Sequence, residues 1–149
     1  QLTFRMVDDT LDFFRDKEEA LAAFKQANPE RARTLELKCP RDAFCWLESE
    51  RQSELIAFIK TLDLPEDHTI GFQPMFDNAA GGVSRQYYRT YFLFRKVELE
   101  GSTLARAMVL FEQRGEPYVS IELNAAGARR FAEVTRDNVM PGTKLARWL

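Results

Sequence analysis

The chain opens with apolar side chains at every second position: Leu2, Phe4 and Met6. A period of two is typical of a half-buried strand, which we expect to end at the acidic pair that follows. Residues 34–38 and 44–48 are also strand-like, and they lie on either side of a short polar segment. The first part of the sequence therefore predicts three short strands.

Two helices are predicted in the same half by apolar residues at spacings of three and four. The first begins near Asp16 and Glu19, which stand in the order of a capping box, and it ends before an Asn-Pro pair. Ser49 and Gln52 introduce the second in the same order. The two apolar stripes consist of Ala20, Leu21, Phe24 and Ala27, and of Leu55, Ile56, Ile59 and Leu62.

Aromatic residues dominate the middle of the chain. Residues 69–73 predict a strand, 75–82 an exposed loop, and 87–97 a long strand. Successive residues of that strand face opposite sides and both sides are apolar, which favours a central strand buried on both faces. In the functional interpretation, Tyr87, Tyr88 and Tyr91 lie beside a mobile loop and help an exposed sheet edge bind an extended polypeptide by strand addition.

The last third predicts a hairpin followed by a helix. Strands at 105–112 and 117–123 flank an Arg-Gly-Glu turn, with Val119 and Ile121 on one face. Asn124 is expected to cap a helix. The expected buried stripe of this helix is Ala128, Phe131, Ala132 and Thr135. A final strand is expected at 143–149, and the whole pattern predicts an α+β fold with about three helices on a mainly antiparallel sheet.

Composition narrows the class of protein. The 149 residues include 21 Lys and Arg against 23 Asp and Glu, for a formal net charge of -2. We therefore expect one globular domain of 1–149 without the positive field that nucleic acid requires. No apolar run approaches the roughly 20 residues of a membrane span, so the fragment itself is not expected to be membrane-embedded. The chain has no initiator Met and stops inside a predicted strand, so we expect a piece of a longer protein.

Cys39 and Cys45 are the only cysteines. Their spacing matches neither a zinc knuckle nor a redox motif, so no metal is expected. A Pro-Arg-Asp-Ala turn between the flanking strands would bring the two Cβ atoms together, which makes a local disulfide plausible. The alternative is a pair of reduced cysteines that act as small apolar side chains.

Catalytic chemistry has little support in the sequence. His68, beside Glu66 and Asp67, is the obvious acid-base candidate, but a loop histidine flanked by acids is usually only solvated. The glycine pair at 81–82 lacks the Lys-Ser/Thr of a phosphate loop. We therefore expect no enzyme and no cofactor, and keep a hydrolase centred on His68 only for comparison.

Two stretches in the last third carry a family resemblance. Residues 93–107 read LFRKVELEGSTLARA, and residues 119–138 read VSIELNAAGARRFAEVTRDN. This arrangement resembles SecD, the membrane component that assists preprotein export, at the head of its first periplasmic domain. Residues 2–8 also resemble the segment of the family that leads into this head. Residues 11–86 match no pattern that we can name, and Arg147 stands where the family is apolar.

The resemblance implies a non-catalytic head domain on the periplasmic side of the bacterial inner membrane. Residues 87–149 would be its family-like part and 8–86 an enlarged or divergent N-terminal part. Its implied partners are the translocating preprotein and, through parts outside this chain, SecF and the SecYEG translocon. An oxidising compartment would also favour the disulfide between Cys39 and Cys45. The alternative is an independent exported ligand-binding or adaptor domain on the same scaffold.

Overall fold

The computed structural model describes residues 2–78, 82 and 84–139. They belong to two compact units, one formed by Val7–Arg95 and the other by the residues up to Met6 and from Lys96 on. The first unit contains α1 (Glu18–Ala27), β2 (Glu36–Lys38), β3 (Trp46–Ser49), α2 (Gln52–Ile59), β4 (His68–Asn78) and the part of β5 (Ser84–Glu100) that ends at Arg95.

The strands of the first unit form antiparallel pairs around β5. Leu37 of β2 lies opposite Leu47 of β3, and Ser49 of β3 lies opposite Tyr88 of β5. On its other side β5 pairs with β4 along the whole length of β4, from His68 opposite Phe94 to Asn78 opposite Ser84. In this part of the chain β5 is therefore an inner strand.

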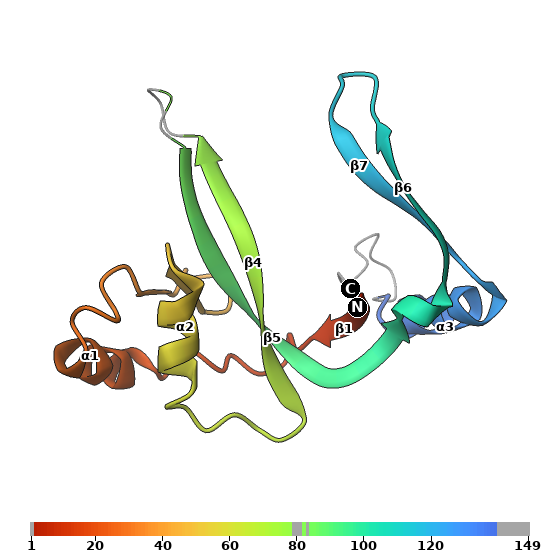
Figure 1. Cartoon of the computed structure of the whole chain (residues 1–149). Helices are drawn as coiled ribbons and strands as arrows, with labels where there is room; N and C mark the ends of the chain where they lie inside the picture. Colours follow the sequence, from red (N-terminus) through yellow and green to blue (C-terminus); the bar gives the residue numbers. More distant parts are fainter. Residues whose placement is uncertain (1, 79–81, 83, 140–149) are drawn as a thin grey trace. The chain divides into compact units, whose positions relative to one another are not determined.

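One face of this sheet carries the hydrophobic core together with α1 and α2 (Figure 1). Phe24 of α1 and Phe58 of α2 pack ring to ring, with centroids 5.3 Å apart. Leu47, Leu55 and Phe58 are fully shielded from solvent. The predicted apolar stripes therefore meet the sheet where alternate residues of β3 and β5 point inward.

Two local expectations are wrong in this unit. Met75 to Asn78, predicted as part of a loop, continue β4 because β5 supplies a main-chain partner for each of them. The capping boxes do not form: Lys17 and Arg51 are the N-cap residues, without a side-chain cap. The Ser49 hydroxyl instead donates a hydrogen bond to the Glu54 carboxylate and accepts one from the main-chain N–H of Arg51.

His68 is buried, contrary to the expectation of a solvated loop histidine. It opens β4, and its ring stacks on Phe92 at a centroid distance of 4.3 Å. Its Nε2 lies 2.8 Å from Asp8 Oδ2, and its Nδ1 lies 2.7 Å from Asp67 Oδ1. Pairing with β5 and stacking on Phe92 draw the residue into the interior, where two carboxylates satisfy both ring nitrogens.

Asp8 is the buried partner in this cluster. Its main-chain N–H donates to the Phe92 carbonyl, and Thr10 donates to Asp8 Oδ1 through both N–H and Oγ1. Burial alone would raise the pKa of the Asp8 carboxyl, but the hydrogen bonds from Thr10 and the contact with His68 outweigh it and hold the pKa below its ordinary value. The cluster fastens the segment after β1 to β4 and β5.

The second unit contains β1 (Thr3–Val7) up to Met6, the rest of β5, the 3₁₀ turn η1 (Gly101–Thr103), β6 (Leu104–Phe111), β7 (Pro117–Leu123) and α3 (Ala125–Asp137). β1 pairs with β5, and β6 and β7 form a separate two-stranded sheet. The predicted hairpin is confirmed, and Gly115 takes the positive φ of 80° that its three-residue turn requires.

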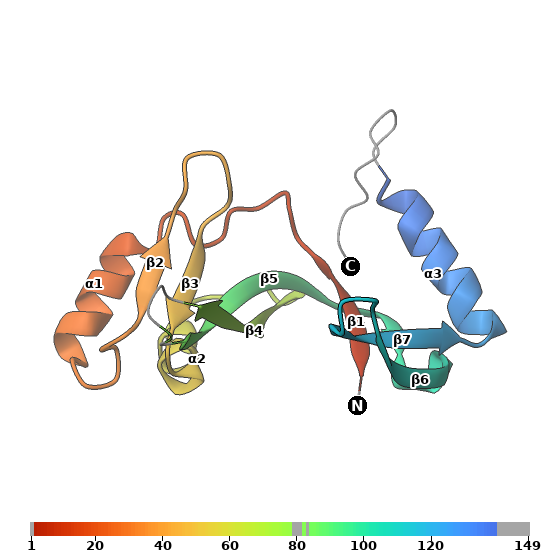
Figure 2. The same cartoon turned by 90° about the horizontal axis from the view of Figure 1, so that it is seen from above.

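α3 begins where β7 ends (Figure 2). Asn124 caps it as predicted, accepting a hydrogen bond from the Gly127 N–H at 2.9 Å. A Cβ on Gly127 would lie 2.7 Å from the Thr103 Cβ, so only glycine allows this approach to η1.

The predicted buried stripe of α3 is wrong. Gly127 and Val134 face inward, whereas Phe131 is 37% exposed. Arg130 also turns toward the sheet, where it forms an ion pair with Glu98 of β5. This ion pair explains why the buried side of α3 differs from the predicted one. Burial alone would raise the pKa of Glu98, but hydrogen bonds from Arg130 and Lys96 outweigh it and lower that pKa.

Three helices and a mostly antiparallel arrangement of strands are present among the described residues, so the α+β prediction is confirmed. The strand expected at 143–149 lies outside them. Cys39 and Cys45 lie on the connection between β2 and β3, with their Cα atoms 4.3 Å apart and their sulfur atoms joined. Whether the protein forms this disulfide stays a prediction.

We predict that protein made in an oxidising compartment carries the bond between Cys39 and Cys45. Replacing both cysteines by Ser should lower the free energy of unfolding by roughly 2 kcal/mol, because the unfolded chain regains the freedom of a short closed loop. Mass spectrometry after alkylation, without and with prior reduction, tests the bond itself. Two alkylated thiols in the unreduced sample would show that the prediction is wrong.

A second prediction follows from the lowered pKa of Asp8. Its carboxylate stabilises the fold above the ordinary value of 3.8, and this stabilisation is lost as the pH falls through the lower folded value. Asp8→Ala should cost about 1–3 kcal/mol at neutral pH, because it leaves His68 Nε2 without its buried partner. The variant should also lose less stability than the parent on further acidification.

Urea unfolding at neutral pH and in steps below about pH 4 measures both effects. Asp63→Ala, which removes an exposed carboxylate, is the control and should behave like the parent. If the parent and Asp8→Ala lose stability equally on acidification, the Asp8 carboxylate does not stabilise the fold as predicted.

Candidate functional site

The three candidate tyrosines lie on β5, where Tyr88 has a neighbouring strand on both sides. Tyr88 lies opposite Ser49 of β3 on one side and opposite Pro74 of β4 on the other. The expectation of an exposed edge is therefore wrong for Tyr88. Its neighbour on β3 is distant in sequence, and periodicity carries no information about it.

The tyrosines also point to different faces of the sheet. Tyr88 packs against the hydrophobic core beside Phe72. Tyr87 and Tyr91 have the opposite parity and share a face with Arg89. Tyr87 is nevertheless only 9% exposed, and its burial, with Asp77 and Glu48 nearby, raises the pKa of its hydroxyl. The structure therefore does not bring the three rings together on one surface.

Aromatic rings and guanidinium groups alternate on the face opposite the core. The Arg89 guanidinium lies 3.9 Å from the Trp46 ring centroid and 5.1 Å from that of Tyr91. The Arg85 guanidinium lies 4.9 Å from the Tyr87 ring, and the Tyr91 hydroxyl donates to Gln73 Oε1 at 2.7 Å. Such cation–π contacts order the long side chains and offer a ligand flat surfaces, but no nucleophile.

The His68 cluster does not provide an accessible acid-base site. The ring is 6% exposed, and both of its nitrogens already contact carboxylates. Within the described ranges, no group of three or more His, Cys, Asp or Glu side chains is arranged to hold a metal ion. Within the same ranges, none of the helices has the length and apolar character that a membrane span requires.

Several of the exposed large apolar side chains among the described residues lie together on the hairpin β6–β7. Cross-strand partners share a face of an antiparallel pair, so one face holds the three pairs Ala107 with Ile121, Val109 with Val119, and Phe111 with Pro117. We call these six residues the hairpin face. It carries no charged side chain.

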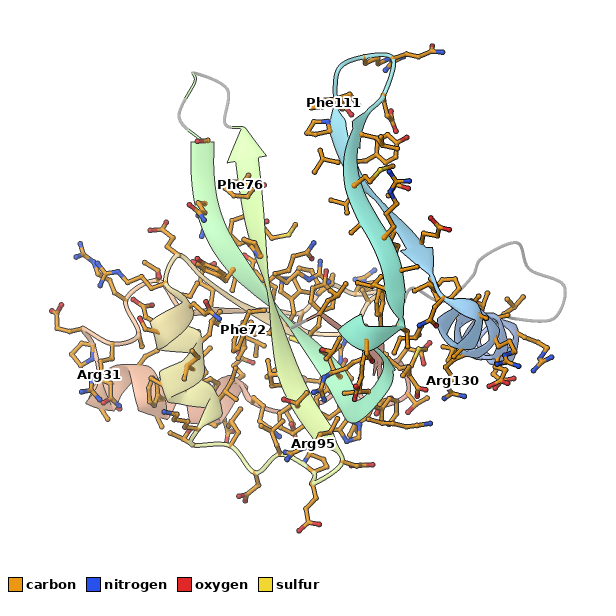
Figure 3. The ribbon with its side chains drawn as sticks, turned by 45° about the vertical axis from the view of Figure 1, so that its right-hand side comes forward. Arg31, Phe72, Phe76, Arg95, Phe111 and Arg130 are labelled. Carbon is orange, nitrogen blue, oxygen red and sulfur yellow. A yellow bond between two sulfur atoms is a disulfide. The ribbon has the colours of Figure 1, made fainter. Side chains whose placement is uncertain are left out.

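The hairpin face is open to solvent along its length. Val109, Val119 and Phe111 are 60%, 65% and 69% exposed. Figure 3 shows Phe111 near the closed end of the hairpin. The alternation of apolar residues at 119 and 121 was visible in the sequence, but the pattern predicts only that a face is suited to burial, not that another element covers it.

Comparisons with known proteins connect this part of the chain to a family. Residues 76–149 match the SecDF P1 head subdomain. Protein translocase subunit SecD of Calditerrivibrio nitroreducens is 33% identical over 113 residues, which are 75% of this chain and 21% of that protein. SecD of Desulfurispirillum indicum is 38% identical over 104 residues, which are 67% of this chain and 19% of that protein.

Protein translocase subunit SecDF of Thermus thermophilus is 46% identical over 48 residues, which are 32% of this chain and 6% of that protein. The chain thus spans a fifth or less of the length of most of these curated relatives. No solved structure matches.

The family match includes residues 87–149 and with them the segments 93–107 and 119–138, whereas residues 2–8, which also carried the resemblance, lie outside it. The resemblance to the SecDF P1 head subdomain is therefore confirmed over residues 76–149.

Proposed function

We propose that this chain is a non-catalytic head domain of a SecD-like accessory subunit of the protein translocase, and that it assists export by transient contact with the translocating polypeptide. The observation that carries the proposal is the exposed, uncharged hairpin face within the family-matched residues. Exposed apolar patches of this kind are typical of interaction surfaces.

The small area of the hairpin face suits weak binding of a client that must be released. An eight-residue strand is about 27 Å long, and two strands are about 10 Å wide, so the face offers only a few hundred Å². Stable complexes bury about 800 Å² on each partner. Contact with the hairpin face alone is therefore weak, and apolar side chains accept many client sequences because dispersion and burial are not directional.

The proposed setting follows from the family. The proposal places the chain on the periplasmic side of the bacterial inner membrane, with the preprotein as its client. Contacts with SecF and the SecYEG translocon would run through parts of the protein outside this chain. We also propose that residues 1–149 act as one P1-head-like domain, with 8–86 as its enlarged or divergent part and 87–149 as its family-like part. The family match begins within the former part, at residue 76.

We predict that Val109→Thr combined with Phe111→Thr lowers photo-crosslinking to a reduced, unfolded polypeptide severalfold. Threonine retains the β-branched shape that strands favour, and both positions are largely exposed, so the free energy of unfolding should change by no more than about 0.5 kcal/mol. Crosslinking yield and thermal melting are measured on the same preparations.

Phe76→Thr is the matched control, since Phe76 of β4 is 66% exposed and lies outside the hairpin (Figure 3). It should leave crosslinking unchanged. Unchanged crosslinking in the hairpin double variant would contradict the proposed surface.

The candidate tyrosines give a separate prediction. Tyr88→Ser should cost about 3 kcal/mol, because it leaves a cavity against the core, whereas Tyr91→Ser should change stability little. If the face with Arg89 also contacts clients, Tyr91→Ser should lower crosslinking while the melting temperature stays the same. Unchanged crosslinking in Tyr91→Ser would count against this second contact surface.

A further inference from the structure

The turn fixes which main-chain groups of β6 point away from β7. The Glu112 N–H donates to the Glu116 carbonyl at 2.9 Å, so these two residues form a hydrogen-bonded pair. Hydrogen-bonded and non-hydrogen-bonded pairs alternate along an antiparallel ladder. The pairs of Phe111, Val109 and Ala107 are therefore of the non-bonded kind, and their N–H and C=O groups point away from β7.

The same three residues contribute their side chains to the hairpin face. β6 therefore presents outward main-chain groups and exposed apolar side chains from the same positions. Among the described strands β6 pairs only with β7, and we call its other side the free edge. An extended chain placed there would satisfy these groups and widen the apolar face at once.

The opposite edge of the hairpin is less suitable. Pro117 begins β7 at a non-bonded position, so its outward nitrogen has no hydrogen to donate. β4 has Pro74 in its interior, whereas residues 104–111 contain no proline. Native edges are often protected by proline, and β6 lacks this protection.

We propose that the free edge of β6 binds an extended polypeptide segment as an added strand, with alternate apolar side chains of the segment continuing the hairpin face. The inference rests on the proposed function and specifies how the client is bound. Main-chain hydrogen bonds are independent of sequence, and the absence of charge on the face selects uncharged side chains at every second position of the client.

A second copy of this chain is a poorer occupant than a client segment. The few hundred Å² of the hairpin face fall well below the about 800 Å² on each partner that a stable dimer buries. A short extended segment needs no such area, because it binds and leaves as the client moves.

The test uses the whole chain and a fluorescent peptide of alternating Val and Thr, long enough to span β6. Two versions carry N-methyl groups, either on every Val or on every Thr. In an added strand only alternate N–H groups face β6. The version whose methyl groups replace these N–H groups should bind at least about tenfold more weakly than the unmodified peptide. The other version should bind nearly as well as the unmodified peptide. Equal binding of the two N-methylated versions would overturn strand addition.

Two proline variants provide a matched test on the protein. Val109 and Val119 lie directly opposite one another and contribute to the same face. Val109→Pro should weaken peptide binding about tenfold, whereas Val119→Pro should change it by no more than about twofold. Equal weakening by both variants, or dimers at β6 that exclude the peptide in sedimentation, would also overturn the inference.

The outcomes separate this inference from the proposed function. If Val109→Thr with Phe111→Thr abolishes crosslinking but N-methylation shows no alternation, the face binds clients through side chains and only strand addition fails. If the double variant changes neither crosslinking nor peptide binding, the proposed function fails with it. The N-methylated peptides need no protein variant, so their result does not depend on whether the proline variants fold.

Discussion

The hydrogen-bonding capacity of β5 is the constraint on which the rest of the structure depends. Its 17 residues run through both compact units and pair with β4, β3 and β1. Because a buried N–H or C=O must be satisfied, these partners fix where the aromatic side chains of β5 can point. Tyr88 packs against the core, and the strand has partners on both sides at this residue.

The hairpin β6–β7 shows the opposite situation. Among the described strands each of its two strands has one partner, and neither face of a two-stranded sheet is buried by the sheet itself. Isolated hairpins are marginal in water, and this one is anchored at its base, where Gly127 meets Thr103 and Arg130 pairs with Glu98. With the anchor at one end, the side chains of Val109, Phe111 and Val119 remain exposed to solvent.

Two ion pairs that involve buried carboxylates hold neighbouring elements together. Asp8 and His68 join the segment after β1 to β4, and Glu98 with Arg130 joins α3 to β5. In each pair the charged atoms contact one another, which satisfies polar groups that burial would otherwise leave without partners.

Local signals in the sequence were enough to predict the hairpin around Gly115, the cap at Asn124, and the family pattern of residues 119–138. Contacts between distant segments were needed to show that Met75 to Asn78 extend β4 and that His68 is buried and Phe131 is not. The same holds for the strand pairing, in which β5 has several partners and β6 has one among the described strands. Periodicity reports which faces are suited to burial. Which segment covers a face or pairs with an edge depends on contacts between residues far apart in the chain, and these have no local signature.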